Sequence, residues 1–279
     1  MIFAAGGHSL DLTHPIVMGV LNVTPDSFSD GGLWLEPEAA IEHARAMVAD
    51  GASIVDVGGE STRPGAEDVP EQEELRRVLP VIEALAADPG VPVSIDTRKP
   101  AVARRALEAG AVIVNDTSGE ESTPAMSDVI AGSNAGAVLM HSRGTPATMR
   151  TLNHYEDVAT DVGTFLAGWA RDLGAAGVAR ERIVLDPGFG FAKSPQQNLE
   201  LLDRLDEIVA LGYPVLAGTS RKSFIGAVLD LPEDDRVEGT AATVAWAVAR
   251  GAKILRVHDV RQMVRVVKMV DAIASRAQP

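Results

Sequence analysis

The chain has 279 residues, 46% of them hydrophobic, so it can bury the core of one large α/β domain or of two smaller domains. It carries 25 Lys and Arg residues against 39 Asp and Glu residues, and the net charge of −14 argues against a general nucleic-acid-binding or anionic-membrane surface. The absence of cysteine excludes a disulfide framework and a thiolate zinc site.

The first residues show no secretory signal, and no apolar run in the sequence is long enough to span a membrane. We therefore expect a cytoplasmic protein. Residues 1–14 combine Phe3, the Gly6-Gly7 pair, Leu10 and Leu12, a pattern that predicts a short β-hairpin.

From residue 16 onward, short apolar segments alternate with amphipathic ones. The apolar segments are rich in β-branched residues, which is typical of parallel strands covered on both faces. They are Ile16–Leu21, Ser53–Val57, Val91–Ile95, Ala111–Val114, Ala137–Met140, Arg182–Leu185, Tyr213–Ala217 and Lys253–Val257.

The amphipathic segments predict helices. Several begin with Pro in the first turn, and several end at a Gly suited to the left-handed cap position, namely Gly51, Gly110, Gly212 and Gly251. The predicted helices are Pro37–Asp50, Glu71–Ala87, Pro100–Ala109, Pro124–Ala131, Asp157–Ala176, Pro195–Leu211, Arg236–Arg250 and Asp259–Ala274.

About eight strands alternating with about eight helices predict an α/β fold, a single (β/α)8 TIM barrel over residues 1–279 with the hairpin of residues 1–14 covering its N-terminal end. The alternative is an open doubly wound sheet. It is less favoured because no G-x-G-x-x-G follows the first strand and the composition does not change toward a second domain.

The active site of such a barrel lies at the carboxyl ends of its strands. These ends are unusually polar here: Asn22, Asp56, Asp96, Asn115, Asp116, His141, Asp186, Ser220, Lys222, Arg256 and His258. The carboxylates and the amide could hold Mg²⁺ or Mn²⁺ through oxygen ligands. They could equally accept hydrogen bonds from the amino and ring N–H groups of a planar heterocycle. Asp56 and Asp116 could also serve only as helix caps or loop anchors.

Cationic residues follow the last two predicted strands, where barrels often bind phosphate. Lys222 follows the seventh strand, and Arg256 and His258 belong to the eighth. The apolar neighbours of Arg256 argue against a surface role, whereas Arg221 fits a surface position. A lone strand-end histidine such as His141 fits a hydrogen-bonded wall residue.

Two long polar loops, at about residues 22–36 and 58–70, follow the first two strands. Both are rich in glycine, the first contains Phe28, and the second contains Arg63. Loops of this kind are typical of mobile lids over an active site.

Eight segments together resemble the signatures of the dihydropteroate synthase family of pterin-binding barrels. They are Asn22–Gly32, Gly58–Gly65, Ser94–Thr97, Asn115-Asp116, Met140-His141, Asp186–Phe191, Ser220–Lys222 and Arg256–Asp259. They follow the family's order from about residue 16 to the C-terminus, without a departure at a functional position.

The resemblance implies an alkyl or aryl transferase of folate biosynthesis. Its reaction would join 6-hydroxymethyl-7,8-dihydropterin diphosphate to 4-aminobenzoate, giving 7,8-dihydropteroate and diphosphate by way of a pterin carbocation. The resemblance also implies that sulfonamides mimic 4-aminobenzoate and that the enzyme is a homodimer.

The resemblance further assigns residues to each ligand. The pterin would be bound by Asp56, Asp96, Asn115, Met140, Asp186, Phe191 and Lys222. Diphosphate would be bound by Asn22, Arg63, Arg256 and His258, with Mg²⁺ bridging Asn22 to the phosphate oxygens. The 4-aminobenzoate would be framed by Phe28, Thr62, Arg63, Pro64, Phe191, Ser220 and Lys222. The catalytic groups would be Asp30, Asp96, Lys222, Arg256 and His258.

Two other functions remain as alternatives. A methyltetrahydrofolate:corrinoid methyltransferase would share the pterin pocket but would not need Arg63, Arg256 and His258 for diphosphate. A non-catalytic pterin-binding paralogue would not need intact lids. Since the pterin residues lie on strand ends, we expect their pocket to exist without ligands, and we expect the 4-aminobenzoate pocket to need the lids.

Overall fold

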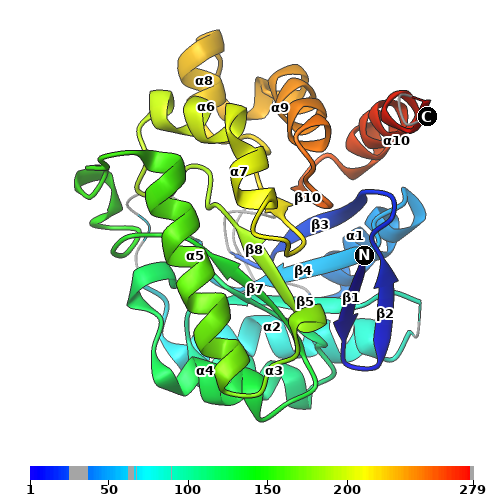
Figure 1. Ribbon diagram of the computed structural model, residues 1–279. Helices are drawn as coiled ribbons and strands as arrows, with labels where there is room; N and C mark the ends of the chain where they lie inside the picture. Colours follow the sequence, from blue (N-terminus) through cyan, green and yellow to red (C-terminus); the bar gives the residue numbers. More distant parts are fainter. Residues whose placement is uncertain (25–36, 62–65, 67, 89, 277–279) are drawn as a thin grey trace.

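A computed structural model describes residues 1–24, 37–61, 66, 68–88 and 90–276 (Figure 1). Its main sheet has eight parallel strands in the order β8-β7-β6-β5-β4-β3-β10-β9. These strands are β3 (Ile16–Asn22), β4 (Ile54–Gly58), β5 (Val93–Thr97), β6 (Ile113–Asp116), β7 (Gly136–Met140), β8 (Ile183–Asp186), β9 (Leu216–Ala217) and β10 (Ile254–Val257). The two edges meet through a bridge between Leu185 and Val215, so the sheet closes into the expected barrel.

Helices connect the strands and cover the outside of the barrel (Figure 1). They are α1 (Pro37–Ala49), α2 (Glu71–Ala86), α3 (Pro100–Glu108), α4 (Pro124–Ala131), α5 (Val158–Ala175), α6 (Pro195–Asp203), α7 (Leu205–Val209), α8 (Ser223–Leu229), α9 (Val237–Ala249) and α10 (Val260–Arg276). The four helix-ending glycines have φ between 80° and 109°, as their position requires. None of the described helices is long and apolar enough to cross a membrane.

The helices depart from the sequence prediction in two places. The single helix expected at Pro195–Leu211 is two helices, because Arg204 leaves the helical conformation with φ −101° and ψ 23°. Its guanidinium instead bonds carboxylates of Asp157, Glu200 and Glu207. Helix α8 was not predicted at all, since seven residues interrupted by Gly226 are too few to show a helical period.

Strand β9 is shorter than the expected Tyr213–Ala217. The cause is Pro214, which has no N–H to donate to a neighbouring strand. Its carbonyl still accepts the N–H of Leu185 at 2.9 Å, and Val215 forms only the isolated bridge. The barrel therefore closes at its weakest pairing, next to the strand that leads into Ser220 and Lys222.

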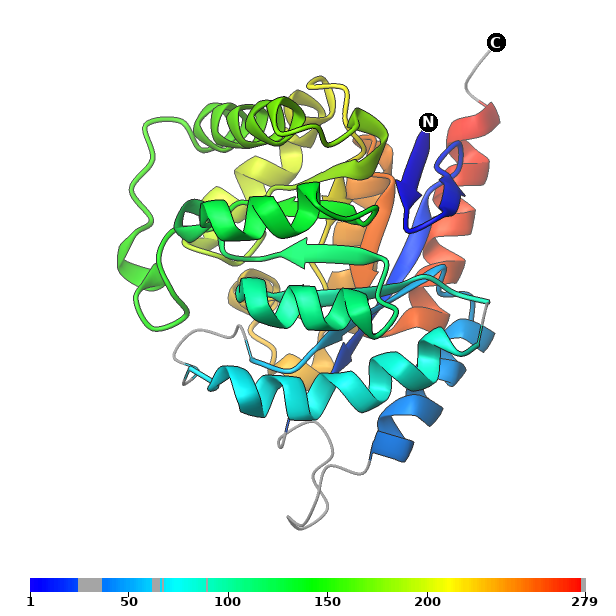
Figure 2. The ribbon, with the colours of Figure 1, turned by 90° about the horizontal axis from the view of Figure 1, so that it is seen from below.

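The N-terminal hairpin closes the bottom of the barrel as expected. Strands β1 (Ile2–Ala5) and β2 (His8–Asp11) pair antiparallel, and the hairpin lies near α10 in Figure 2. Phe3 and Leu12 are fully buried against the first inward-facing residues of the barrel strands. An added Cβ at Gly136 would approach the Phe3 ring to 2.5 Å, so this glycine makes room for the hairpin.

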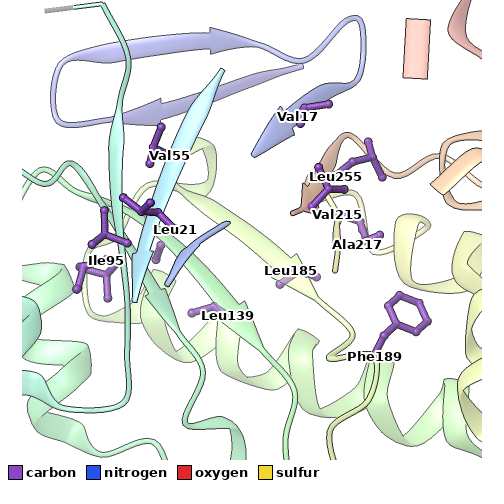
Figure 3. Packing of buried hydrophobic residues seen from close by; sticks show 14 of the residues in the cluster. Val17, Leu21, Val55, Ile95, Leu139, Leu185, Phe189, Val215, Ala217 and Leu255 are labelled. Atoms are coloured by element: carbon purple, nitrogen blue, oxygen red, sulfur yellow. The ribbon is translucent and has the colours of Figure 1, made fainter. Parts of the chain in front are cut away.

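The main core lies between the barrel and its helices. Figure 3 shows Val55 and Ile95 on the adjacent strands β4 and β5, and Leu139 and Leu185 on the adjacent strands β7 and β8, within this layer. Residues one position away along each strand must face the barrel interior, because side chains alternate between the two faces of a strand. This alternation decides which polar residues enter the site.

Candidate active site

The site forms one layer above the apolar interior of the barrel. Ile54, Ile113, Val138, Val184 and Ile254 belong to the buried cluster beneath the hairpin. The residues two positions further along these strands therefore face the same way. They are Asp56, Asn115, Met140, Asp186 and Arg256. The inward-facing residues are therefore apolar in the lower layer of the barrel and mostly polar in the layer above it, where they form a polar ring at the carboxyl ends of the strands.

Arg256 joins this ring into a buried network. Its Nε donates to Asp56 Oδ2 at 2.7 Å, and its Nη2 donates to Asp96 Oδ2 at 2.7 Å. Asn115 Nδ2 donates to the same Asp56 oxygen at 2.9 Å, and Thr117 Oγ1 donates to Asp96 Oδ1 at 3.0 Å. Burial raises the pKa of Asp96 to about 7, and the neighbouring Arg256 opposes that rise.

Asp56 occupies a supporting position in this network. It is fully buried and lines neither of the cavities described below, whereas Asp96 lines both. Its Oδ1 and the Asn115 Oδ1 have no hydrogen-bond partner among the described residues. Asp56 thus holds Arg256 and Asn115 in place, and a direct contact of Asp56 with the pterin stays a prediction.

Asp186 and Lys222 form the opposite wall. Asp186 Oδ1 accepts the backbone N–H of Gly188 at 2.8 Å, and burial raises the pKa of Asp186 to about 6. The Lys222 ammonium lies 4.0 Å above the centroid of the Phe191 ring, a cation–π contact. Burial lowers the pKa of Lys222 to about 8.

His258 and Ser220 form a second polar group. Ser220 Oγ accepts the backbone N–H of His258 at 3.2 Å and lies 3.0 Å from His258 Nδ1. Burial lowers the pKa of His258 to about 3, so the imidazole is neutral at pH 7. A hydroxyl that donates to Nδ1 leaves the ring proton on Nε2.

Two adjoining cavities lie at this end of the barrel. The outer one has a volume of about 350 Å³ and is lined by Asn22, Asp96, Phe191, Ser220, Lys222, Arg256 and His258, among others. The inner one is lined by Asp96, Asn115, Met140, Asp186, Phe191, Lys222 and Arg256, among others, and holds only about 10 Å³. That volume is close to the space of one water molecule. The expectation that the pterin pocket exists without ligands stays a prediction.

Three strand-end residues play structural parts. Asp116 accepts hydrogen bonds from Ser118 and Ser122, so it anchors a loop. His141 is fully buried, as a wall residue would be. Arg221 is more than a surface cation, because its guanidinium binds both carboxylate oxygens of Asp259 at 2.6 and 3.0 Å.

Some predicted residues lie outside the described part of the chain. They are Phe28, Asp30, Thr62, Arg63 and Pro64. The outer cavity also has lining residues to which the sequence analysis assigned no role. Thr24 and Ser61 lie inside the signature segments Asn22–Gly32 and Gly58–Gly65, and the rest are Arg150, Ser223, Glu233 and Arg236. Ser223 directly follows the Lys222 motif and could have been found from it. The others come from loops and helix ends, where no strand period marks them.

The side chains of the site also indicate what kind of metal site they could form. The described residues contain no group of three His, Asp or Glu side chains able to hold a metal ion. Asp56 and Asp96 are instead paired with Arg256. A cage of carboxylates around Mg²⁺ does not fit this arrangement. A single amide oxygen at Asn22, on the cavity wall, fits an ion held chiefly by substrate phosphates and water.

Comparison with known proteins agrees with this geometry. A family model described as pterin binding enzyme matches residues 18–258. Dihydropteroate synthase of Bacillus subtilis (strain 168) is 49% identical over 261 residues, covering 94% of this chain and 89% of the relative. The corresponding enzyme of Escherichia coli (strain K12) is 45% identical over 271 residues, covering 97% and 96%.

Solved structures extend the likeness to three dimensions. Yersinia pestis dihydropteroate synthase with a sulfonamide drug complex has a TM-score of 0.93 at 44% identity, covering 99% of this chain and 100% of that one. Burkholderia cenocepacia dihydropteroate synthase complexed with 7,8-dihydropteroate has a TM-score of 0.88 at 42% identity, covering 99% and 98%. The chain therefore belongs to the dihydropteroate synthase family of pterin-binding enzymes.

Proposed function

We propose that this cavity joins 6-hydroxymethyl-7,8-dihydropterin diphosphate to 4-aminobenzoate, as a dihydropteroate synthase of folate biosynthesis. The observation that carries the proposal is the arrangement of charge in the two adjoining cavities. The acceptors Asn115 and Asp186 line only the inner one, His258 lines only the outer one, and Lys222 and Arg256 line both. A substrate with a donor-rich ring and an anionic tail matches this order.

The pterin ring belongs in the inner cavity. Asp186 and Asp96 offer carboxylate oxygens to its amino and ring N–H groups, while Met140 and Phe191 supply apolar walls. The amide of Asn115 is fixed by Asp56 and keeps an unpartnered Oδ1 as a further acceptor.

The diphosphate belongs in the outer cavity. Arg256 provides a guanidinium fork for phosphate oxygens, and neutral His258 provides an Nε2–H donor. We expect Asn22 to hold Mg²⁺ with the diphosphate, and Mg²⁺ would supply positive charge for the developing leaving group. Arg63 joins this group in the proposal and lies outside the described residues.

Breaking the bond between the methylene carbon and the diphosphate oxygen leaves a carbocation delocalised into the pterin. Arg256 and His258 stabilise the negative charge that collects on the departing diphosphate. Asp96, together with Asp30 outside the described residues, stabilises the positive charge. The amine of 4-aminobenzoate, already neutral at pH 7, then attacks the cation and loses a proton.

The 4-aminobenzoate would enter through the outer cavity, beside Phe191, Ser220 and Lys222. Phe28, Thr62, Arg63 and Pro64 complete its site in the proposal, and they lie outside the described residues. Sulfonamides would compete at the same place. The two alternative functions are less favoured. A corrinoid methyltransferase would have no use for the cations of the outer cavity. A non-catalytic paralogue is less favoured because the relatives bear the name of an active synthase.

We further propose a homodimer in the cytoplasm. Five large apolar side chains are exposed on neighbouring helices: Val228 and Leu229 on α8, Trp246 on α9, and Met269 and Ile273 on α10. These helices form one row in Figure 1. A second copy of this row would bury the apolar surface. The cytoplasm is the compartment where a charged diphosphate substrate is accessible without crossing a membrane.

The Arg256→Met variant tests the assignment. Calorimetry would compare the pterin diphosphate with the same pterin lacking diphosphate. We expect the variant to weaken the first ligand by at least about tenfold more than the second, corresponding to about 1.4 kcal/mol. Equal losses for both ligands would mean that Arg256 is only the structural partner of Asp56 and Asp96.

A further inference from the structure

Lys193 is a buried lysine for which the proposed reaction has no use. The residue is only 9% exposed. Its Nζ donates to the carbonyl oxygens of Gly188 and Phe191, each at 3.0 Å, and lies 3.0 Å from His141 Nδ1. These three partners use all three N–H donors of an ammonium group. Such complete pairing is what a buried lysine requires.

The segment that Lys193 binds has an unfavourable backbone. Gly188 and Gly190 have φ of 69° and 84°, and Ala192 has φ of 48° although it carries a Cβ. An added Cβ at Gly188 would overlap the carbonyl oxygen of His141, so the chain passes very close to β7. A segment in this conformation persists only where its surroundings hold it.

Both ends of this segment reach the pterin cavity. At one end the Gly188 N–H binds Asp186 Oδ1 at 2.8 Å. At the other end Phe191 places its ring under the Lys222 ammonium. Lys193 binds the carbonyls of the same two residues, and so connects the acceptor wall of the cavity to its aromatic wall.

The third partner of Lys193 is itself rigid. The His141 ring packs edge-on against Phe165 with centroids 5.2 Å apart, and it lies 6.0 Å from Tyr155. Burial lowers the pKa of His141 well below its usual value, so the ring is neutral, and its Nδ1 accepts a hydrogen bond from Lys193 when the ring proton is on Nε2. Lys193 is thus tied to β7 while it holds the segment after β8.

We propose that Lys193 is a positioning residue that fixes residues 188–192, so that Asp186 and Phe191 meet the pterin ring in the correct geometry. The inference rests on the proposed function of the cavity. It assigns no contact between Lys193 and substrate. Its effect must therefore be largest in pterin binding, which uses both Asp186 and Phe191, and smaller in 4-aminobenzoate recognition, which uses Phe191 alone.

The test compares Lys193→Met, which keeps the length and removes all donors, with Lys193→Gln, which keeps an amide donor group. Calorimetry with the pterin lacking diphosphate should show at least about tenfold weaker binding for Lys193→Met and an intermediate loss for Lys193→Gln. The KM for the pterin diphosphate should rise in parallel, and the KM for 4-aminobenzoate should rise clearly less.

Ser194→Ala is the matched control. Ser194 is the next residue and caps α6 in a capping box with Gln197, without touching the carbonyls of Gly188 or Phe191. We expect Ser194→Ala to lower the melting temperature and to leave pterin binding unchanged. Wild-type pterin binding in Lys193→Met, or equal rises in both KM values, would overturn the positioning role. Absence of pterin binding by the wild-type protein would instead refute the proposed function.

The wild-type protein offers a check that needs no variant. Nitrogen-15 NMR should show the His141 ring protonated on Nε2, with Nδ1 as the acceptor of the Lys193 bond. This result would support the Lys193–His141 hydrogen bond on which the positioning role rests, even if both lysine variants failed to fold. A proton on Nδ1 would contradict it.

Discussion

Asp96 and Asp186 show how burial sets the chemistry of single residues in this site. Both are carboxylates with raised pKa values, about 7 and about 6, because they lie in a water-poor layer of the barrel. Asp96 forms an ion pair with Arg256, whereas Asp186 accepts one hydrogen bond from the backbone N–H of Gly188. Each carboxyl group offers both oxygens as full acceptors to a heterocycle only while it is ionised.

Truncation of Asp186 should reduce pterin affinity. Asp186→Ala leaves the donors of the pterin unpaired in a buried cavity, which costs about 1–3 kcal/mol. We expect calorimetric affinity for the pterin to fall at least about tenfold while the circular dichroism spectrum stays native. Unchanged affinity would remove Asp186 from the pterin contacts.

The raised pKa of Asp186 predicts a pH dependence of known sign. Below about pH 6 the carboxyl is protonated and can accept fewer hydrogen bonds, so pterin affinity should fall as the pH drops from about 7.5 to about 5. The pterin without diphosphate is the suitable ligand, since phosphate also titrates in this range. Asp186→Asn should flatten the part of the profile that Asp186 causes. An equally steep profile in that variant would assign it to another group.

The strand ends are the elements that the sequence predicted best. An apolar residue such as Val184 faces the barrel floor, and the period of two then places Asp186 in the site without knowledge of the rest of the fold. The ion pairs of Arg256 with Asp56 and Asp96 could not be predicted, because they join residues 200 and 160 positions apart, respectively. Helix α8 and the role of Arg150 could not be predicted either, because no periodic pattern of apolar residues marks them in the sequence.

The segment after β8 should be the element least tolerant of an added methyl group. Gly177 and Gly188 both have positive φ, but a Cβ at Gly177 meets no atom within 4 Å, whereas one at Gly188 overlaps the His141 carbonyl. We expect Gly177→Ala to lower the free energy of unfolding by about 1–2 kcal/mol. Gly188→Ala should cost about 4 kcal/mol or more. Urea denaturation measures both, and similar losses would show that His141 does not confine the segment.

At the scale of the whole molecule, the hairpin and the active site occupy opposite ends of the barrel. The hairpin seals the amino-terminal end with Phe3, and the polar ring opens at the carboxyl end. The residues that stabilise the fold and the residues of the active site are thereby placed at opposite ends of the barrel axis. That the entire chain of 279 residues behaves as one domain stays a prediction.

Removal of the hairpin's aromatic ring should affect stability much more than the reaction. Phe3→Ala should lower the free energy of unfolding by about 3–5 kcal/mol, since the side chain is fully buried. Ile2→Ala is the matched control in the same strand, because Ile2 is 43% exposed, and its loss should stay near 0.5 kcal/mol or below. The KM values of folded Phe3→Ala should equal those of the wild type. A change in KM for either substrate would contradict the separation of the two ends.

Product formation by the purified protein tests the central claim most directly. Chromatography would follow 7,8-dihydropteroate and diphosphate in the presence of Mg²⁺, the pterin diphosphate and 4-aminobenzoate, with each substrate omitted in turn. We predict equimolar formation of both products only when both substrates are present, and loss of this turnover in Arg256→Met. Binding of the pterin diphosphate without any dihydropteroate formed would contradict the account and leave a pterin-binding protein without synthase activity.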